Sequence, residues 1–310
     1  MAGLSCADGL RASGHAITLF DKGRGPGGRM STRRVDTPLG PTAFDHGAQY
    51  FTARDAEFCR QIDRWEGEGI VARWPQAGPD AWVGTPSMNA VIRAMASSHD
   101  VRWNTRIERI AKEPQGWSLN CAGDVFSDFD AVMLAIPPEQ ALPFLSLHDF
   151  AMAREAMLAR SQPCWTAMFS FAAPVECDTD FVRDSGNLAW AARNGAKPGR
   201  SGPEGWVVQA RPEWSQAHLE DEADDVAADL LSELAAALGI SAPAAVTAAA
   251  HRWRYAMSAG LGLGAMWNAQ TKIGLCADWL LGPRVECAWL SGQKLARAVQ
   301  ERVPDAAHSG

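Results

Sequence analysis

The first thirty residues constrain the fold more than any other part of the chain, because helix, strand, acid and glycine signals follow one another without a gap. Residues 2–13 carry helix-compatible small and polar residues, and Gly14 is a typical helix stop. Residues 15–20 form an apolar run of strand length, which Asp21 closes. Four glycines follow within residues 23–28. This succession predicts an α/β fold of the kind that binds nucleotides.

Most of a dinucleotide-binding unit is present in this region. Such a unit needs a strand, a tight glycine turn, a helix whose N-terminus binds pyrophosphate, and a second strand that ends in an acid. Gly3 lies eighteen residues before Asp21, where the last glycine of a G-x-G-x-x-G motif is expected. The first strand and two glycines are missing, so we expect a late start or a truncated unit, short by about ten residues. The same order also fits an ordinary strand–helix unit with a surface aspartate.

Composition narrows the class of protein. The 310 residues are 47% hydrophobic and 21% charged, which is ordinary for a chain with a sizeable core and excludes disordered, collagen-like and coiled-coil classes. A net charge of −7 argues against a nucleic-acid binder. We expect a cytoplasmic protein, because no long apolar run or signal peptide is visible. We expect it to be a monomer or a homodimer. Seven cysteines without a C-x-x-C pair indicate reduced thiols, and no grouping has the spacing of metal ligands.

Hydrophobic periodicity predicts further elements along the chain. Helices are expected at 55–68, capped by Asp55, from Ser87 through Met95, and at 218–238 and 284–303. Gly292, inside the last of these, predicts close packing against another backbone, since glycine costs about 1 kcal/mol relative to alanine in a helix. The stretch 196–204 is the best candidate for an exposed loop. Strands are expected near 105–112, 116–121, 130–136, 163–172, 186–192, 205–211, 246–256 and 272–277.

A second glycine motif follows the acid. Gly27-Gly28-Arg29-Met30-Ser31, about six residues after Asp21, resembles the second fingerprint of flavin oxidoreductases of the amine-oxidase superfamily. Its glycines would let the backbone approach a diphosphate, and Arg29 would supply positive charge. A generic glycine turn with a solvated arginine is the alternative interpretation of this motif alone.

Longer blocks resemble the renalase family, especially its bacterial branch. They are ordered, well spaced and several residues long, so together they are more specific than a glycine pattern. The blocks are residues 19–31 (Leu-Phe-Asp-Lys-Gly-Arg-Gly-Pro-Gly-Gly-Arg-Met-Ser), 45–52 (Asp-His-Gly-Ala-Gln-Tyr-Phe-Thr), 82–88, 251–256, 278–279 and 284–292.

The resemblance implies a non-covalent FAD enzyme with two interleaved domains. One is a Rossmann-type FAD-binding domain with a truncated first strand, expected at 1–73, 98–145 and 270–310. The other is an inserted α+β substrate domain built on an antiparallel sheet, expected at 74–97 and 146–269.

By position, the resemblance also assigns residues to parts of FAD. Asp21 would bind the adenosine ribose, Ile107 the adenine side through its backbone, and Asp278 the ribityl or diphosphate region. Val285 would offer a backbone N–H to the flavin at the start of the last helix. Along the diphosphate and ribityl chain would lie Arg24, Gly27, Gly28, Arg29 and Met30, with Gly3 as the last glycine of the motif; near the isoalloxazine ring would lie Ala48, Gln49, Tyr50 and Phe51.

Several residues keep two interpretations. We favour a non-catalytic His46, because flavin hydride transfer needs no obligatory protein base. His251 fits a structural histidine better than a ligand, whereas Trp253, Tyr255 and Trp279 fit either the walls of a substrate site or the core. Two departures from the family pattern are Ala277, where glycine usually precedes the aspartate, and Cys287, where glycine or alanine is common.

For function, the resemblance implies a flavin oxidase without a catalytic side chain. Isomeric dihydronicotinamides, the 2- and 6-dihydro forms of NAD(P), would give a hydride to flavin N5 and return to NAD(P)⁺, and O₂ would reoxidise the flavin to give H₂O₂. Two alternatives are an amine or carotenoid-type flavin oxidoreductase of the same superfamily and a non-catalytic remnant that has lost FAD.

Overall fold

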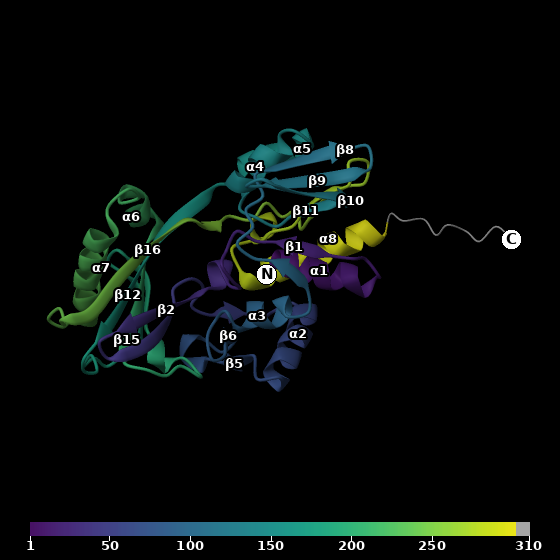
Figure 1. Cartoon of the computed structure of the whole chain (residues 1–310). Coiled ribbons are helices and arrows are strands. Elements are labelled where there is room, and N and C mark those ends of the chain that lie inside the picture. Colours follow the sequence, from purple (N-terminus) through teal and green to yellow (C-terminus); the bar gives the residue numbers. More distant parts are fainter. Residues whose placement is uncertain (302–310) are drawn as a thin grey trace. The chain divides into compact units, whose positions relative to one another are not determined.

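The computed structural model describes residues 1–301, which form two compact units, each built from separate stretches of the chain (Figure 1). Unit 1 comprises Met1–Pro26, Ala94–Ser161 and the described residues from Ser258 onward, and unit 2 comprises Gly27–Arg93 and Gln162–Met257. The predicted α/β fold is confirmed. Residues 27–73 fall in unit 2, whereas we expected them in the FAD-binding domain. That expected division is made by ligand, and its boundaries stay a prediction.

Unit 1 contains two parallel strand pairs, as a nucleotide-binding fold requires. Strand β1 (Thr18–Phe20) pairs in parallel with β7 (Asp100–Arg102), and β11 (Val132–Leu134) pairs in parallel with β18 (Ile273–Leu275). Strand β17 (Met266–Asn268) adds to β18 in the antiparallel sense. The other elements are an antiparallel sheet of β8 (Arg109–Glu113), β9 (Gly116–Cys121) and β10 (Asp124–Phe129), and the helices α1 (Ala2–Ala12), α4 (Pro138–Leu145), α5 (Phe150–Leu158), η4 (Asp278–Leu280) and α8 (Val285–Gln300).

Helices α1 and α8 of unit 1 pack against each other with almost no gap at Gly292 (Figure 1). A Cβ atom at Gly292 would lie 2.3 Å from the carbonyl oxygen of Ala2 and 2.8 Å from the amide nitrogen of Cys6. The Ser5 hydroxyl donates to the Trp289 carbonyl at 2.7 Å in the same contact. The predicted close backbone packing at Gly292 is therefore confirmed. The predicted end of this helix at Val303 lies outside the described residues.

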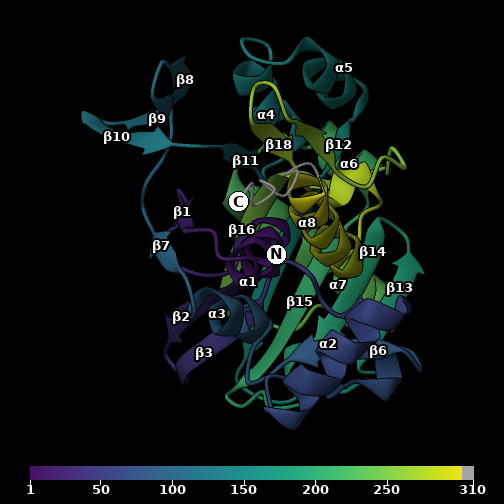
Figure 2. The same ribbon diagram turned by 90° about the vertical axis from the view of Figure 1, so that its right-hand side faces the viewer.

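Unit 2 is built on a five-stranded sheet with the order β13-β14-β15-β12-β16. The pairs β13–β14, β14–β15 and β12–β15 are antiparallel. Helix α7 (Ala223–Leu238) covers this sheet, with Val226, Leu230 and Leu234 buried against it (Figure 2). The sheet strands are β12 (Ser161–Phe171), β13 (Phe181–Ser185), β14 (Leu188–Arg193), β15 (Glu204–Ala210) and β16 (Ala245–Ser258).

Smaller elements complete unit 2. Strands β2 (Thr32–Thr37) and β3 (Gly40–Asp45) form a hairpin, and η1 (Gly28–Met30) precedes it. Strands β4 (Phe51–Thr52), β6 (Ala81–Gly84) and β5 (Val71–Arg73) form a small sheet, and the remaining helices are α2 (Ala56–Gly67), η2 (Pro75–Ala77), η3 (Asn194–Ala196) and α6 (Pro212–Ala217). Helix α3 (Ala90–Ala96) crosses the boundary between the two units.

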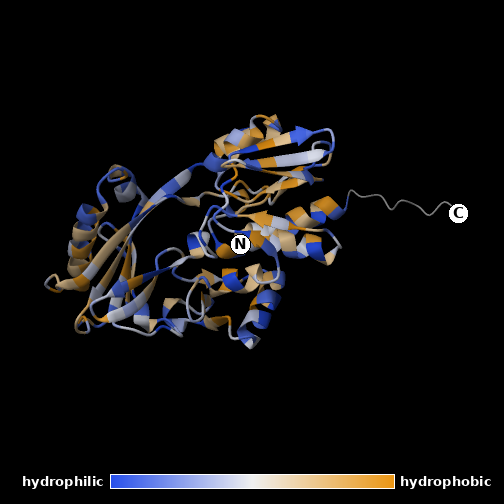
Figure 3. Cartoon of the chain, viewed as in Figure 1, coloured by the Kyte–Doolittle hydropathy of each residue, from blue (hydrophilic) through white to orange (hydrophobic). Residues whose placement is uncertain are grey.

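Helix caps explain which predicted helix limits are right. The Asp55 carboxylate accepts from the amides of Glu57 and Phe58, so α2 begins where predicted. Ser87 does not begin a helix, because its hydroxyl bonds the Asn89 side chain and α3 starts at Ala90. Helix α7 starts at Ala223 rather than at 218, since the short helix α6 precedes it, and it ends at Gly239 in the left-handed conformation as predicted. Hydrophobic and hydrophilic residues alternate along α7 (Figure 3).

The prediction of an exposed loop at 196–204 is wrong for Lys197 and Arg200. Lys197 is 2% exposed, and the side chain of Arg200 is 4% exposed. Both are buried because they pair with the carboxylate of Asp45, which is far away in sequence. Helices α4, α5 and α6 and strands β10 and β13 were also missed, since they are short and lack a clear period.

Candidate functional site

Asp21 lies in unit 1 directly after β1, at the carboxyl end of a strand in a parallel pair. One carboxylate oxygen accepts the amide of Gly23 at 2.7 Å, which fixes the start of the glycine loop. The side chain is exposed, and the loop continues through the exposed Arg24. Ligands of open α/β sheets bind beyond the carboxyl ends of the strands, and Asp21 lies at such an end.

Gly3 lies in the first turn of α1, where the helix packs on unit 1. A Cβ atom at Gly3 would lie 3.1 Å from the Cβ of Ala135, which directly follows β11. The last glycine of a dinucleotide motif has this role of allowing close packing of helix and strand.

The start of α8 offers backbone N–H groups in unit 1. The side chain of the N-cap residue Arg284 does not cap the backbone amides of the first turn, and its guanidinium pairs with the buried Glu286 carboxylate in that turn at 3.0 Å. Val285 is the first helical residue, and Asp278, 6% exposed, begins η4 after β18. Ile107 follows β7 and packs partly on the core of the unit. A helix N-terminus of this kind favours a negative charge.

Two glycines and an arginine begin unit 2. Gly27 has φ 157° and Gly28 has φ 56°, both conformations that favour glycine, and around Gly28 a Cβ atom would meet nothing within 4 Å. The Arg29 guanidinium donates to the Ala256 carbonyl at 3.0 Å. Met30 is 4% exposed and serves as core.

The segment 46–50 packs tightly on the backbone of Arg29. The Ala48 amide donates to the Arg29 carbonyl at 2.8 Å. A Cβ atom at Gly47 would lie 2.1 Å from the same carbonyl oxygen, so any side chain there must displace the backbone. The Gly47 carbonyl accepts from Gln209 at 2.8 Å, and the His46 carbonyl accepts from Trp253 at 2.8 Å.

A buried charge cluster lies beneath this segment. The Asp45 carboxylate, 1% exposed, accepts from Arg200 Nε at 3.1 Å and from the Met88 amide at 2.9 Å. Lys197 Nζ lies 3.7 Å from that carboxylate and donates to Gln49 Oε1 at 2.9 Å. The Gln49 amide nitrogen donates back to the carbonyls of Asp45, at 2.5 Å, and Gly47, at 3.1 Å. This cluster therefore ties Gln49 to the core.

Burial and charge shift the pKa values in this cluster. Burial raises the pKa of Asp45, but attraction by Lys197 and Arg200 and the Met88 hydrogen bond outweigh it, so the pKa is lowered. Burial lowers the pKa of Lys197 to about 8 against the opposing attraction of Asp45. At neutral pH, two cations therefore face one carboxylate.

His46 is a neutral base enclosed by aromatic rings. Burial, together with the charges of His251 and Arg33, lowers its pKa to about 4. Its ring centroid lies 5.0 Å from that of His251 and 5.1 Å from that of Trp253, and its Nε2 lies 3.4 Å from the Ser31 hydroxyl. The Nδ1 atom is buried without a hydrogen-bond partner among the described residues. These contacts are those of a structural histidine, and its predicted non-catalytic role stays a prediction.

The two aromatic residues after Gln49 have different surroundings. Tyr50 is half-buried, and its ring lies 5.4 Å from Trp190 and 6.5 Å from Trp74. The Arg183 guanidinium lies 5.4 Å from the Tyr50 ring and 4.8 Å from the Trp190 ring. Phe51 is 4% exposed and packs on Phe58 of α2 at 6.2 Å, so its ring belongs to the core.

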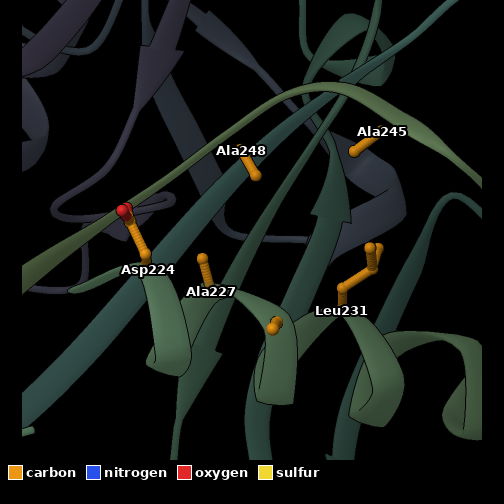
Figure 4. A pocket seen from close by; sticks show the side chains of 6 residues that line it. Asp224, Ala227, Leu231, Ala245 and Ala248 are labelled. Carbon is orange, nitrogen blue, oxygen red and sulfur yellow. The ribbon is translucent and has the colours of Figure 1, made fainter. Parts of the chain in front are cut away.

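Other features of the described residues offer few polar groups to a ligand. A cavity of about 390 Å³ between α7 and β16 is lined by alanine and leucine with one carboxylate, Asp224 (Figure 4). Trp279 is 1% exposed and its indole N–H donates to Ile136, as expected of a core residue. Within residues 1–301 no group of three or more His, Cys, Asp or Glu side chains is arranged to hold a metal, and no disulfide joins the cysteines, five of which are buried. No helix in this range is long and apolar enough to cross a membrane.

Sequence reasoning missed Lys197, Arg200 and Arg183. Lys197 and Arg200 lie 148 residues or more from Gln49 and Asp45 in sequence, within a glycine- and proline-rich stretch that is typical of a solvated loop. The only sequence signal was Asp45 itself, an acid at the buried end of an apolar strand, which requires a partner.

Two family patterns match this chain. The NAD(P)-binding Rossmann-like domain matches residues 1–62, and the flavin containing amine oxidoreductase family matches residues 70–300, which is more than half of the chain. The chain belongs to the flavin containing amine oxidoreductases. It is therefore an FAD-dependent oxidoreductase, as the sequence predicted at the level of the superfamily.

Solved structures share the fold of this oxidoreductase. A protein from Exiguobacterium sp. assigned as a protoporphyrinogen oxidase has a TM-score of 0.74 at 13% identity, over 97% of this chain and 96% of that one. Cyclohexylamine oxidase from Brevibacterium oxydans has a TM-score of 0.69 at 12% identity, over 97% and 96%. A putrescine oxidase variant has a TM-score of 0.69 at 14% identity, over 97% of both chains.

One curated relative matches over only part of its length. The tRNA 5-methylaminomethyl-2-thiouridine biosynthesis bifunctional protein MnmC of Magnetococcus marinus is 25% identical, over 44% of this chain. The match covers 28% of that protein, so most of the relative has no counterpart in the match.

The residues present fit FAD. In unit 1, Asp21 has a second carboxylate oxygen beyond the one that bonds Gly23, and the side chain of Arg284 does not cap the first turn of α8. In unit 2, the open space around Gly28 admits a ligand against the backbone. These are the acceptor, the helix N-terminus and the glycine cradle that ribose and diphosphate groups require.

Proposed function

We propose that this oxidoreductase oxidises isomeric dihydronicotinamide dinucleotides, the 2- and 6-dihydro forms of NAD(P), to NAD(P)⁺ with O₂ as acceptor. The resemblance of residues 19–31, 45–52 and 284–292 to the renalase family supports this substrate class. FAD, bound non-covalently, would supply the hydride acceptor and the route of the electrons to O₂, with H₂O₂ as the product.

The observation that best supports the proposal is the position of the Arg183 guanidinium beside the ring of Tyr50. The Arg183 guanidinium lies over the rings of Tyr50, Phe181 and Trp190, at 5.4, 5.5 and 4.8 Å. A dinucleotide has an anionic pyrophosphate and a flat nicotinamide ring, so a cation with aromatic rings suits it. A protonated amine would meet a like charge at the same place.

We assign the FAD contacts by unit, as the resemblance implies them. In unit 1, Asp21 accepts from the adenosine ribose, Ile107 contacts the adenine side, and Asp278 and the Val285 N–H bind further along the cofactor. In unit 2, the residues assigned to the diphosphate, ribityl chain and ring are Gly27, Gly28, Arg29, Met30, Ala48, Gln49 and Tyr50.

The side chains then orient the reactants rather than transfer a proton. Gln49 is fixed by Lys197 and by two backbone carbonyls, and Tyr50 rests on Trp190, so neither needs to reorganise on binding. Such fixed placement is how a site of this kind accelerates a hydride transfer.

Steady-state H₂O₂ production with several substrates tests the substrate class. We expect turnover with the isomeric dihydronicotinamides formed by borohydride reduction of NAD⁺, and none with cyclohexylamine or putrescine. Arg183→Met should raise KM for the dinucleotide about tenfold, the effect of losing about 1.4 kcal/mol of binding. Arg60→Met, at an exposed position of α2, is the matched control and should keep the wild-type KM.

An amine oxidase is the second candidate, together with a carotenoid-type oxidoreductase of the same superfamily. The structural neighbours named for cyclohexylamine and putrescine favour the amine. Turnover of an amine that is unchanged or faster in Arg183→Met would select it and overturn the dinucleotide. A wild-type protein that takes up no FAD would instead support the non-catalytic remnant.

A further inference from the structure

Lys197 is a buried cation whose closest polar partner is an amide. Its side chain is 0% exposed, and its Nζ lies 2.9 Å from Gln49 Oε1 but 3.7 Å from the Asp45 carboxylate. The indole ring of Trp74 lies 5.8 Å away. A fully buried lysine is expensive, so its position requires a reason beyond folding.

The charge of Asp45 permits the burial of Lys197 but does not explain why Lys197 contacts Gln49. Arg200 already binds the Asp45 carboxylate through both Nε and Nη2, and the Met88 amide and Thr32 hydroxyl bind its other oxygen, at 2.9 and 2.7 Å. Lys197 adds a second cation to a carboxylate that is already neutralised. Its effect is therefore on the group it touches directly, the Gln49 amide.

Contact with Lys197 determines how the Gln49 amide is turned. An ammonium group can only donate, so the atom facing Lys197 must be the amide oxygen. The amide nitrogen then faces the Asp45 and Gly47 carbonyls and donates to both. Gly47 in turn packs on the Arg29 carbonyl, and the Ala48 amide donates to it, so residues 47–49 are held by neighbouring groups.

We propose that Lys197 is a positioning residue, which sets the Gln49 amide and the backbone of residues 47–50 for contact with the isoalloxazine ring. The proposal rests on the FAD assignment under the proposed function, and it holds for a dinucleotide or an amine as substrate. Loss of the ammonium group would leave the Gln49 amide oxygen without its donor, so that only the Asp45 and Gly47 carbonyls would still hold the amide.

The test compares Lys197→Met, Gln49→Leu and the double variant as FAD-loaded proteins, with Lys112→Met at an exposed position of β8 as control. We expect Lys197→Met to change the visible absorption spectrum of bound flavin and to lower kcat about 10- to 100-fold, with KM changed less. The double variant should match Gln49→Leu alone, since Lys197 acts through that residue. Lys112→Met should be indistinguishable from wild type.

Three outcomes overturn the proposal. A wild-type flavin spectrum and kcat in Lys197→Met, in a protein that binds FAD and turns over substrate, would refute the positioning role and leave the proposed function intact. Additive losses in the double variant would show that Lys197 does not act through Gln49. A wild-type chain without bound FAD would overturn the proposed function as well, and is recognised by its colourless spectrum before any variant is made.

Discussion

Two aspartates, one in each unit, lie at the ends of strands but have opposite surroundings. Asp21 of unit 1 is exposed and hydrogen-bonds its own loop through Gly23. Asp45 of unit 2 is 1% exposed and is surrounded by Lys197, Arg200 and backbone amides. Asp21 thus has a carboxylate oxygen that can bind a ligand, whereas both carboxylate oxygens of Asp45 are bonded to groups of the protein.

The comparison separates binding from positioning. An exposed carboxylate at a strand end costs the fold little and binds a ribose hydroxyl through charge-assisted hydrogen bonds. A buried carboxylate must be paired, and in return it fixes every group that pairs with it. We therefore expect changes at Asp21 to affect cofactor affinity and changes at Asp45 to affect stability.

The largest effect is expected at the buried aspartate. Asp45→Asn leaves Lys197 and Arg200 buried without a counter-charge, which should lower the free energy of unfolding by about 3–5 kcal/mol. Urea denaturation measures this, with Asp21→Asn as the matched control at less than about 0.5 kcal/mol. Equal losses in the two variants would erase the distinction between the two aspartates.

A pH-dependent loss of stability is expected next, from His46. Its pKa is about 4 in the folded protein against 6.5 when unperturbed, so the unfolded chain binds more protons in between and stability falls as pH drops from 6.5 to 4. This contribution is on the order of 3 kcal/mol. His46→Gln should remove it from the denaturation curves, whereas His15→Gln, at an exposed position, should leave the pH dependence unchanged. Parallel pH curves for wild type and His46→Gln would disprove the shift.

Gly47→Ala should have a moderate effect. The new Cβ atom would lie 2.1 Å from the Arg29 carbonyl oxygen, so the backbone must move at a cost of about 1–3 kcal/mol. Gly195→Ala is the control, because a Cβ atom there meets nothing within 4 Å. Thermal unfolding of both variants decides this prediction, and a Gly47→Ala protein as stable as Gly195→Ala would show that segment 46–50 is not held rigidly.

The smallest free-energy change should follow from Asp21→Asn. Replacing an ionised acceptor at the ribose should weaken FAD binding about tenfold, or about 1.4 kcal/mol. Fluorescence titration of the apoprotein with FAD gives the Kd, and Asp36→Asn, at an exposed position of β2, serves as control. An unchanged Kd would remove Asp21 from the FAD contacts.

Local signals predicted the nucleotide-binding part better than the charge cluster. Residues near in sequence predict the helix at 2–13 and the strand before Asp21. The tight contact at Gly292 is predicted because glycine destabilises a helix unless close packing requires it. The sequence predicts an exposed loop at Lys197 and Arg200, because their burial depends on Asp45, which lies more than 150 residues away. Phe51 is predicted beside the flavin ring with its neighbours; its side chain is buried against Phe58 of α2, and its contact with the ring stays a prediction.

The central claim is that this flavin-dependent oxidoreductase takes a dihydronicotinamide rather than an amine. Anaerobic mixing of the FAD-loaded protein with borohydride-made isomeric NADH, followed by its visible absorption, tests this most directly. We expect loss of the oxidised flavin spectrum within one turnover and recovery when O₂ is admitted, with no change on addition of cyclohexylamine or putrescine. Bleaching by an amine, with a spectrum that the isomeric NADH leaves unchanged, would contradict it.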